Sequence, residues 1–148
     1  GKEISEAVAS ITQDGIPVCG HLGLMPQSIH KLGGYRVQAK TEVEANKLKE
    51  DAILLQASGA QCLVLECVPV KVAEDVSSLL DIPVIGIGAG VGCDGQVLVM
   101  YDMLGISEQK FKFSKNFLSG RDSITDAIKA YVAAVKNNSF PSISHSYE

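Results

Sequence analysis

The run Cys62-Leu63-Val64-Leu65-Glu66 most restricts how this chain can fold, because uninterrupted apolar residues lead directly to a charged one. A continuous apolar run of this length is typical of a strand buried on both faces, as in a parallel sheet covered by helices. In barrel enzymes, polar side chains at the carboxyl ends of such strands form the active site. The run therefore predicts a buried strand that holds Glu66 at the mouth of an apolar site.

Three further apolar runs predict strands over residues 16–20, 84–88 and 97–101. These strands would deliver, in turn, His21, a glycine-rich turn and Asp102. Because connected parallel strands share one direction, we expect His21, Glu66 and Asp102 to lie at the same end of the sheet.

Apolar residues at helical spacing predict helices over about residues 3–13, 42–58, 70–80 and 122–136. Thr41, with Glu44 three residues later, predicts a capping box at the start of the second helix. The alternation of strands and helices predicts an α/β fold: four parallel strands with helices, equivalent to the carboxyl-terminal half of a (β/α)8 TIM barrel.

The composition indicates a packed globular chain of one domain, residues 1–148, with a polar, extended tail over residues 137–148. Thirteen basic and seventeen acidic residues give a net charge of −4 without long runs of either sign, which argues against nucleic-acid or polybasic membrane binding. No apolar stretch is long enough to span a membrane, so we expect a soluble cytoplasmic or organellar protein. The cysteines at positions 19, 62, 67 and 93 form no CxxC pair and are expected to be reduced and unligated.

Each candidate site residue has two interpretations. Glu66 is a general base favoured by its apolar surroundings, or a glutamate paired with a helix lysine. His21 binds substrate, or is a strand-end residue with a structural hydrogen bond. Asp102 joins the same site, or caps the following loop, which we favour. Arg36, in the glycine-rich segment 33–36, binds a carboxylate from a closing loop, or lies in a solvated turn.

The glycines of Gly86-Ile87-Gly88-Ala89-Gly90 do not form a dinucleotide-binding motif. The GxGxxG pattern needs a glycine at position 91 or 93, where Val91 and Cys93 stand. An anion cradle of backbone N–H groups is conceivable, but we favour glycines that allow a wide loop to turn.

Several ordered motifs resemble the ketopantoate hydroxymethyltransferase family over essentially the whole chain. They are PVCGHLGLMPQS from Pro17, GGYRVQ from Gly33, GAQCLVLECVP from Gly59, IPVIGIGAG from Ile82 and DGQVLVMYD from Asp94. The resemblance implies a (β/α)8 barrel that transfers a one-carbon unit from 5,10-methylenetetrahydrofolate to 3-methyl-2-oxobutanoate with Mg2+, giving ketopantoate for pantothenate synthesis. It also implies that Glu66 is the catalytic proton acceptor, that His21 lines the keto-acid site, and that the enzyme is a homo-oligomer.

The resemblance leaves part of the family's site unaccounted for. The family's metal-binding aspartates and its Lys-x-Glu motif would lie before Gly1, in an amino-terminal half-barrel. We therefore expect the isolated 148-residue chain to be inactive and to need that partner half. The alternatives are a Mg2+-dependent carbon–carbon lyase or mutase of the same keto-acid barrel type, and an inactive half-barrel fragment.

Overall fold

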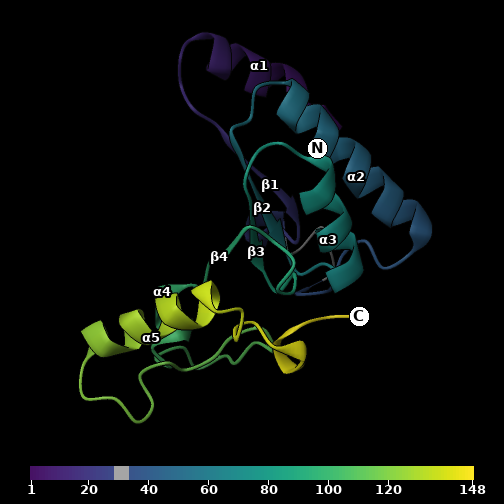
Figure 1. The fold of residues 1–148 in the computed structure, drawn as a ribbon. Helices are drawn as coiled ribbons and strands as arrows, with labels where there is room; N and C mark the ends of the chain where they lie inside the picture. Colours follow the sequence, from purple (N-terminus) through teal and green to yellow (C-terminus); the bar gives the residue numbers. More distant parts are fainter. Residues whose placement is uncertain (29–33) are drawn as a thin grey trace.

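The computed structural model describes residues 1–28 and 34–148, and its centre is a parallel sheet. In these residues four strands pair in chain order, β1-β2-β3-β4 (Figure 1). They are β1 (Cys19–Gly23), β2 (Cys62–Glu66), β3 (Val84–Ile87) and β4 (Gly95–Gln96). Every adjacent pair is parallel, which confirms the predicted α/β fold of four parallel strands with helices, the arrangement of consecutive strands in a βα barrel.

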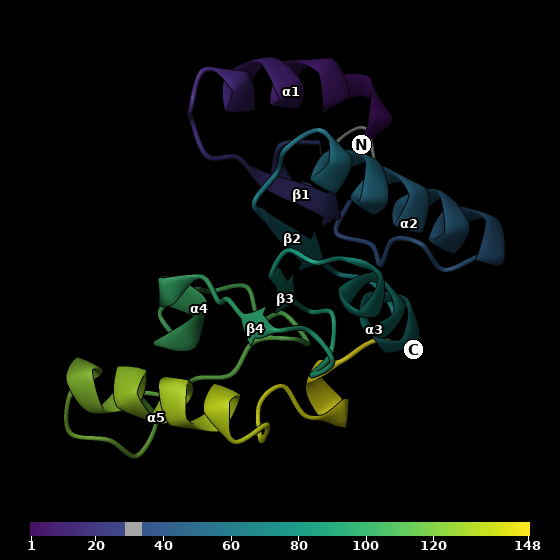
Figure 2. The ribbon, with the colours of Figure 1, turned by 45° about the horizontal axis from the view of Figure 1, so that its top comes forward.

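The helices form two groups around this sheet. Next to β1–β3 lie α1 (Ser5–Gln13), α2 (Glu42–Ala57) and α3 (Val70–Leu79), whereas α4 (Met100–Met103) and α5 (Ile124–Lys136) lie together beyond β4 (Figure 1, Figure 2). Short 3-10 turns are η1 (Lys2–Ile4), η2 (Pro26–Ser28) and η3 (Ile143–His145). None of the helices in the described part of the chain is long and apolar enough to cross a membrane.

The helix boundaries agree closely with the sequence predictions. The predicted capping box of α2 is confirmed: Glu44 N–H donates to Thr41 Oγ1 over 3.3 Å, and Thr41 N–H donates to Glu44 Oε2 over 3.1 Å. These bonds satisfy backbone donors that the first turn of a helix otherwise leaves open. They hold the pKa of the Glu44 carboxyl below its ordinary value.

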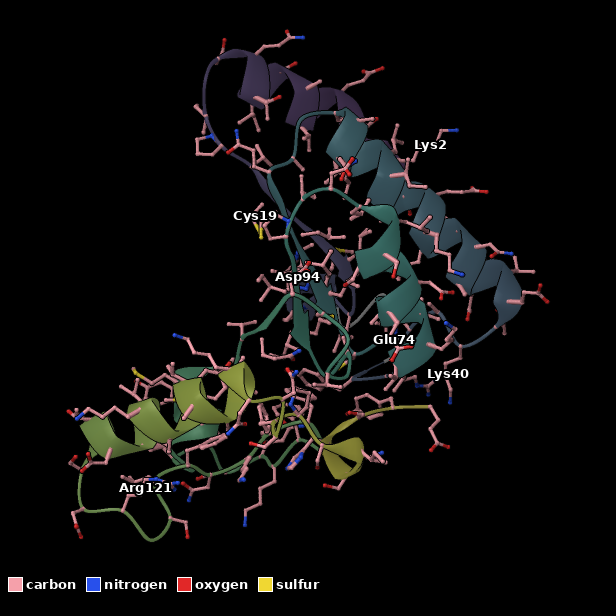
Figure 3. The ribbon with its side chains drawn as sticks, viewed as in Figure 1. Lys2, Cys19, Lys40, Glu74, Asp94 and Arg121 are labelled. Carbon is pink, nitrogen blue, oxygen red and sulfur yellow. The ribbon has the colours of Figure 1, made fainter. Side chains whose placement is uncertain are left out.

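The two faces of the sheet differ because successive side chains of a strand point to opposite sides. Leu63, Leu65 and Val84 are fully buried in the main core, where they meet Leu55 of α2 and Val76 of α3. On the other face, His21, Val64 and Ile85 stand in register across three strands and are only half-buried. At the same face Cys19 is exposed and points away from α2 and α3 (Figure 3).

The first strand begins three residues later than predicted, so His21 lies within β1 and not after it. Pro17 has no N–H and cannot donate to the ladder. Pairing starts immediately after it, where Gln61 N–H donates to the Val18 carbonyl over 2.9 Å. The shift places His21 two residues before the carboxyl end of β1, opposite Val64.

The predicted strand over residues 97–101 is wrong. The strand is Gly95–Gln96, and residues 100–103 form α4, so Asp102 lies in a short helix and does not follow a strand. The apolar run Val97–Tyr101 imitates a buried strand, but in the described structure β4 is an edge of the sheet, and Val97, Val99 and Tyr101 are exposed. A strand with no neighbour on its outer side gains little from extension.

The segment expected to be an extended tail folds back on the molecule instead. Residues 143–145 form η3, and Phe140 is buried in a cluster with Phe117 and Ala127 of α5. Its carboxyl end reaches α3 (Figure 2).

Candidate active site

A histidine and a glutamate meet on the half-open face of the sheet, near the carboxyl ends of β1 and β2. Glu66 is the last residue of β2, and His21 lies in the neighbouring strand β1. His21 Nε2 is 3.2 Å from Glu66 Oε2, close enough for an ion pair when the imidazole is protonated. The structure thus brings the two predicted residues together, whereas no lysine of a neighbouring helix is paired with Glu66 in the described residues.

The pair is sheltered but not sealed. Glu66 is 8% exposed as a residue, while the His21 side chain is 32% exposed. Although Nε2 lies near Glu66, the geometry is not that of a hydrogen bond, and among the described residues this buried nitrogen has no hydrogen-bond partner. A buried polar atom without a partner is costly in a folded protein. It is therefore suited to bind an oxygen atom of a ligand.

The backbone holds Glu66 from both neighbouring strands. Leu24 N–H donates to the Glu66 carbonyl over 2.8 Å, and Cys67 N–H donates to the Ile87 carbonyl over 2.9 Å. Gly23 allows this close approach: its φ is +88°, and a Cβ atom there would collide with the Glu66 carbonyl oxygen. Cys67 itself has a φ of +50°, a left-handed conformation that is uncommon for a residue other than glycine.

An apolar cluster covers the strand ends beside Glu66. Leu24, Cys67, Ile87 and Phe113 are its buried members, and Phe111 stacks on Phe113 with 5.2 Å between ring centroids. Burial, together with the nearby charge of Glu66, raises the pKa of the Cys67 thiol to about 12. Water is largely excluded on this side, and electrostatic interactions are stronger where the dielectric is low.

Asp102 does not join this pair. It is buried in α4 and lines a separate cavity of about 400 Å3 together with Gly105, Ser107, Gln109, Lys110, Phe111, Ser114 and Asn116. No side-chain hydrogen bond of Asp102 occurs among the described residues, so the capping role favoured from the sequence finds no support there.

The two glycine-rich segments also stay apart from the pair. Gly88 and Gly90 have φ values of +62° and +82°, and a Cβ atom at either would press on Phe113 or Val70, respectively. They therefore serve a tight turn and close packing. Arg36 is exposed and forms no ion pair in the described residues, while Gly33 lies outside them.

The described residues do not fit a magnesium site. Nowhere in residues 1–28 and 34–148 do three or more His, Cys, Asp or Glu side chains gather around one point. Mg2+ prefers an octahedron of oxygen ligands, whereas the His21–Glu66 pair offers a single carboxylate and an imidazole.

Three residues near the pair were not assigned a role from the sequence. Gly23 was detectable only as a glycine shortly after an apolar run, and Phe113 only as part of an alternating aromatic pattern. Tyr147, which packs against the cluster beside Glu66, comes from the far end of the chain. No local pattern could have indicated that contact.

Comparisons with known proteins find relatives that match nearly the whole chain. The 3-methyl-2-oxobutanoate hydroxymethyltransferases of Nitrosococcus oceani and Methylobacillus flagellatus are 55% and 56% identical to 99% and 100% of this chain. The enzyme of the same name from Halorhodospira halophila is 49% identical over the whole chain. The chain spans 56%, 57% and 54% of the length of these three relatives, respectively. A model of ketopantoate hydroxymethyltransferases matches residues 1–143, and the chain therefore belongs to that family.

Proposed function

We propose that this chain supplies the catalytic base for transfer of a hydroxymethyl group to 3-methyl-2-oxobutanoate, with 5,10-methylenetetrahydrofolate as the one-carbon donor. The observation that carries the proposal is the His21–Glu66 pair, 3.2 Å apart at the carboxyl end of adjacent parallel strands. The names of the relatives support the substrate and the reaction class.

The chemistry begins with removal of a proton from C3 of the keto acid, the carbon next to the carbonyl. In the proposal, Glu66 Oε2 accepts that proton, and the electron pair of the broken C–H bond delocalises into the carbonyl as an enolate. Glu66 is 8% exposed, so few water molecules compete with a bound substrate for its carboxylate oxygens. Water and 5,10-methylenetetrahydrofolate supply the one-carbon unit at the oxidation level of formaldehyde, as the C–N bonds to the methylene carbon break and tetrahydrofolate leaves. The enolate carbon forms the new carbon–carbon bond with that carbon, and the resulting alkoxide takes up a proton to become the hydroxymethyl group.

His21 has a separate role in this proposal. Its buried Nε2 has no hydrogen-bond partner among the described residues and faces the same space as the carboxylate. A protonated imidazole there would bind a keto-acid oxygen and hold C3 beside Glu66. Fixing a substrate within about 3–3.5 Å of the base lowers the entropic cost of the reaction.

An enolate also needs positive charge near its oxygen, and Mg2+ is the ion that the family resemblance implies. Because the described residues do not form a magnesium site, we assign that ion to ligands other than the residues in the described part of this chain. No step of the proton transfer described here depends on its position.

The test is the substitution Glu66→Gln in the native protein, purified from the cell in which it occurs. The amide keeps the shape of the side chain but cannot accept the proton, so turnover should fall by a factor on the order of 10². Exchange of deuterium into C3 of 3-methyl-2-oxobutanoate measures the proton step directly, and ketopantoate formation measures the whole reaction. Glu50→Gln, on the exposed face of α2, is the matched control. Near-normal exchange in Glu66→Gln would return Glu66 to a structural role.

A further inference from the structure

The carboxyl-terminal segment returns from α5 to the start of α3, next to the candidate site. Both views show the carboxyl terminus beside α3 (Figure 1, Figure 2). Val70 N–H, at the first residue of α3, donates to the Tyr147 carbonyl over 2.9 Å.

This bond caps the amino-terminal end of α3, where no side chain does so. The N-cap residue is Pro69, and no side chain caps the helix. The first N–H groups of a helix have no partner within it, and a proline side chain has no acceptor atom. The Tyr147 carbonyl therefore satisfies a backbone donor that the local sequence leaves open.

The Tyr147 side chain contacts the start of the connection between β2 and α3, which is Cys67–Pro69. Its ring packs against the cluster that contains Cys67, and Lys112 Nζ lies over the ring, 5.1 Å from its centroid. Burial, followed by the influence of the neighbouring Cys67 thiol, raises the pKa of the Tyr147 phenol. Tyr147 thus touches both ends of the connection Cys67–Pro69.

That connection follows Glu66 directly, and it is buried throughout. It begins with Cys67, whose φ of +50° costs conformational energy unless the surroundings enforce it. Any relaxation of this turn would rotate the peptide that carries the Glu66 side chain. A contact that fixes the turn therefore also fixes the direction of the carboxylate.

We propose that Tyr147 is a positioning residue for Glu66: its carbonyl anchors the start of α3 and its ring closes over Cys67. The inference rests on the proposed role of Glu66 as the base. Tyr147 touches no reacting atom in this arrangement, and its effect passes through the turn after β2.

The experiment is deuterium exchange into C3 of 3-methyl-2-oxobutanoate by variants of the native protein. Tyr147→Ala should lower kcat about tenfold with KM within twofold, because misplacement of a base weakens the proton step more than substrate binding. The main-chain carbonyl is present in both variants, but Tyr147→Phe also keeps the ring and should lower kcat only twofold to threefold, about the loss of one weak polar contact. It also serves as the test variant if Tyr147→Ala does not fold. Ile143→Ala, 86% exposed in the same segment, is the control with unchanged kcat.

The double variant separates positioning from general stability. If Tyr147 acts through Glu66, Tyr147→Ala should cause no further loss in a Glu66→Gln background, because residues that act as a unit are not additive. Amide exchange of Val70 should be faster in Tyr147→Ala than in Ile143→Ala.

The outcomes are distinguishable. The inference is overturned if Tyr147→Ala exchanges deuterium like Ile143→Ala while Glu66→Gln is impaired, and also if Tyr147→Ala impairs both backgrounds equally. In either case the proposed function stands. Normal exchange in Glu66→Gln overturns the proposed function and, with it, the positioning role.

Discussion

The two faces of the sheet use the same strands for opposite purposes. The face against α2 and α3 is closed, with Leu63, Leu65 and Val84 fully buried. The opposite face is half-open and holds His21 and Glu66, the only salt bridge between strands in the described residues. Neighbouring residues in one strand, such as Leu65 and Glu66, therefore face the packed core and the candidate site, respectively. Substitutions on the closed face should affect stability, whereas those on the open face should mainly affect the reaction.

The largest expected effect on stability is an exception to the rule that substitutions on the open face mainly affect the reaction. Gly23 belongs to the open face, yet Gly23→Ala should lower the free energy of unfolding by about 3 kcal/mol, from a left-handed φ and a collision with the Glu66 carbonyl. Gly15→Ala is the matched control, because Gly15 has a φ of +80° with no atom near the new Cβ. It should cost about 1 kcal/mol. Urea unfolding measures both, and equal losses would mean that the collision is relieved by a small shift.

The next prediction sharpens the division with one chemical change on each face. Val84→Ala removes fully buried methyl groups and should cost about 2 kcal/mol, whereas Val64→Ala, half-buried on the open face, should cost less than about 1 kcal/mol. Thermal or urea unfolding of the two variants gives the comparison. A larger loss for Val64→Ala would show that the open face is packed as tightly as the closed one.

The smallest effect concerns the outer surface of the closed side. Asp75 of α3 joins Lys49 of α2 over 2.6 Å and Lys71 over 2.9 Å, and these partners hold the pKa of Asp75 below its ordinary value. A carboxyl group whose pKa is lower in the folded than in the unfolded protein stabilises the fold at pH values above its unfolded-state pKa, which is near 4. This stabilisation is lost as the pH falls through the folded-state pKa.

Asp75→Asn should therefore lower the melting temperature slightly at pH 7. The difference should shrink in 0.5 M NaCl, because salt screens exposed charges, and should disappear in acid. Asp51→Asn is a poor control because that carboxylate accepts a bond from Lys2 N–H, but Asp122→Asn, exposed before α5, is suitable. A difference that persists below pH 3 would assign the effect to something other than the ion pairs.

Local patterns predicted the parts of the fold that depend on local interactions. The apolar run of β2, the capping box at Thr41 and the spacing of α3 are each legible within a few residues. The position of Glu66 beside His21 followed from the rule that connected parallel strands share a direction.

One error has a local cause, and the others arose where distant parts of the chain decide the structure. Pro17 delayed the start of β1, although its missing N–H was visible in the sequence. The run Val97–Tyr101 was read as a buried strand because its apolar residues do not reveal that β4 lies at an edge. The contact of Tyr147 with Val70 joins segments that no short window includes.

The strict alternation of β2 also limits which kinds of genetic change this segment tolerates. A single-codon deletion between Cys62 and Glu66 would exchange the residues of the two faces, since the side-chain period of a strand is two. Leucine side chains would then lie on the face of the candidate site, and the carboxylate would point toward the helices. Variation in β2 is thus confined to point substitution, while the exposed turn around Gly15 can change in length without turning β2 over.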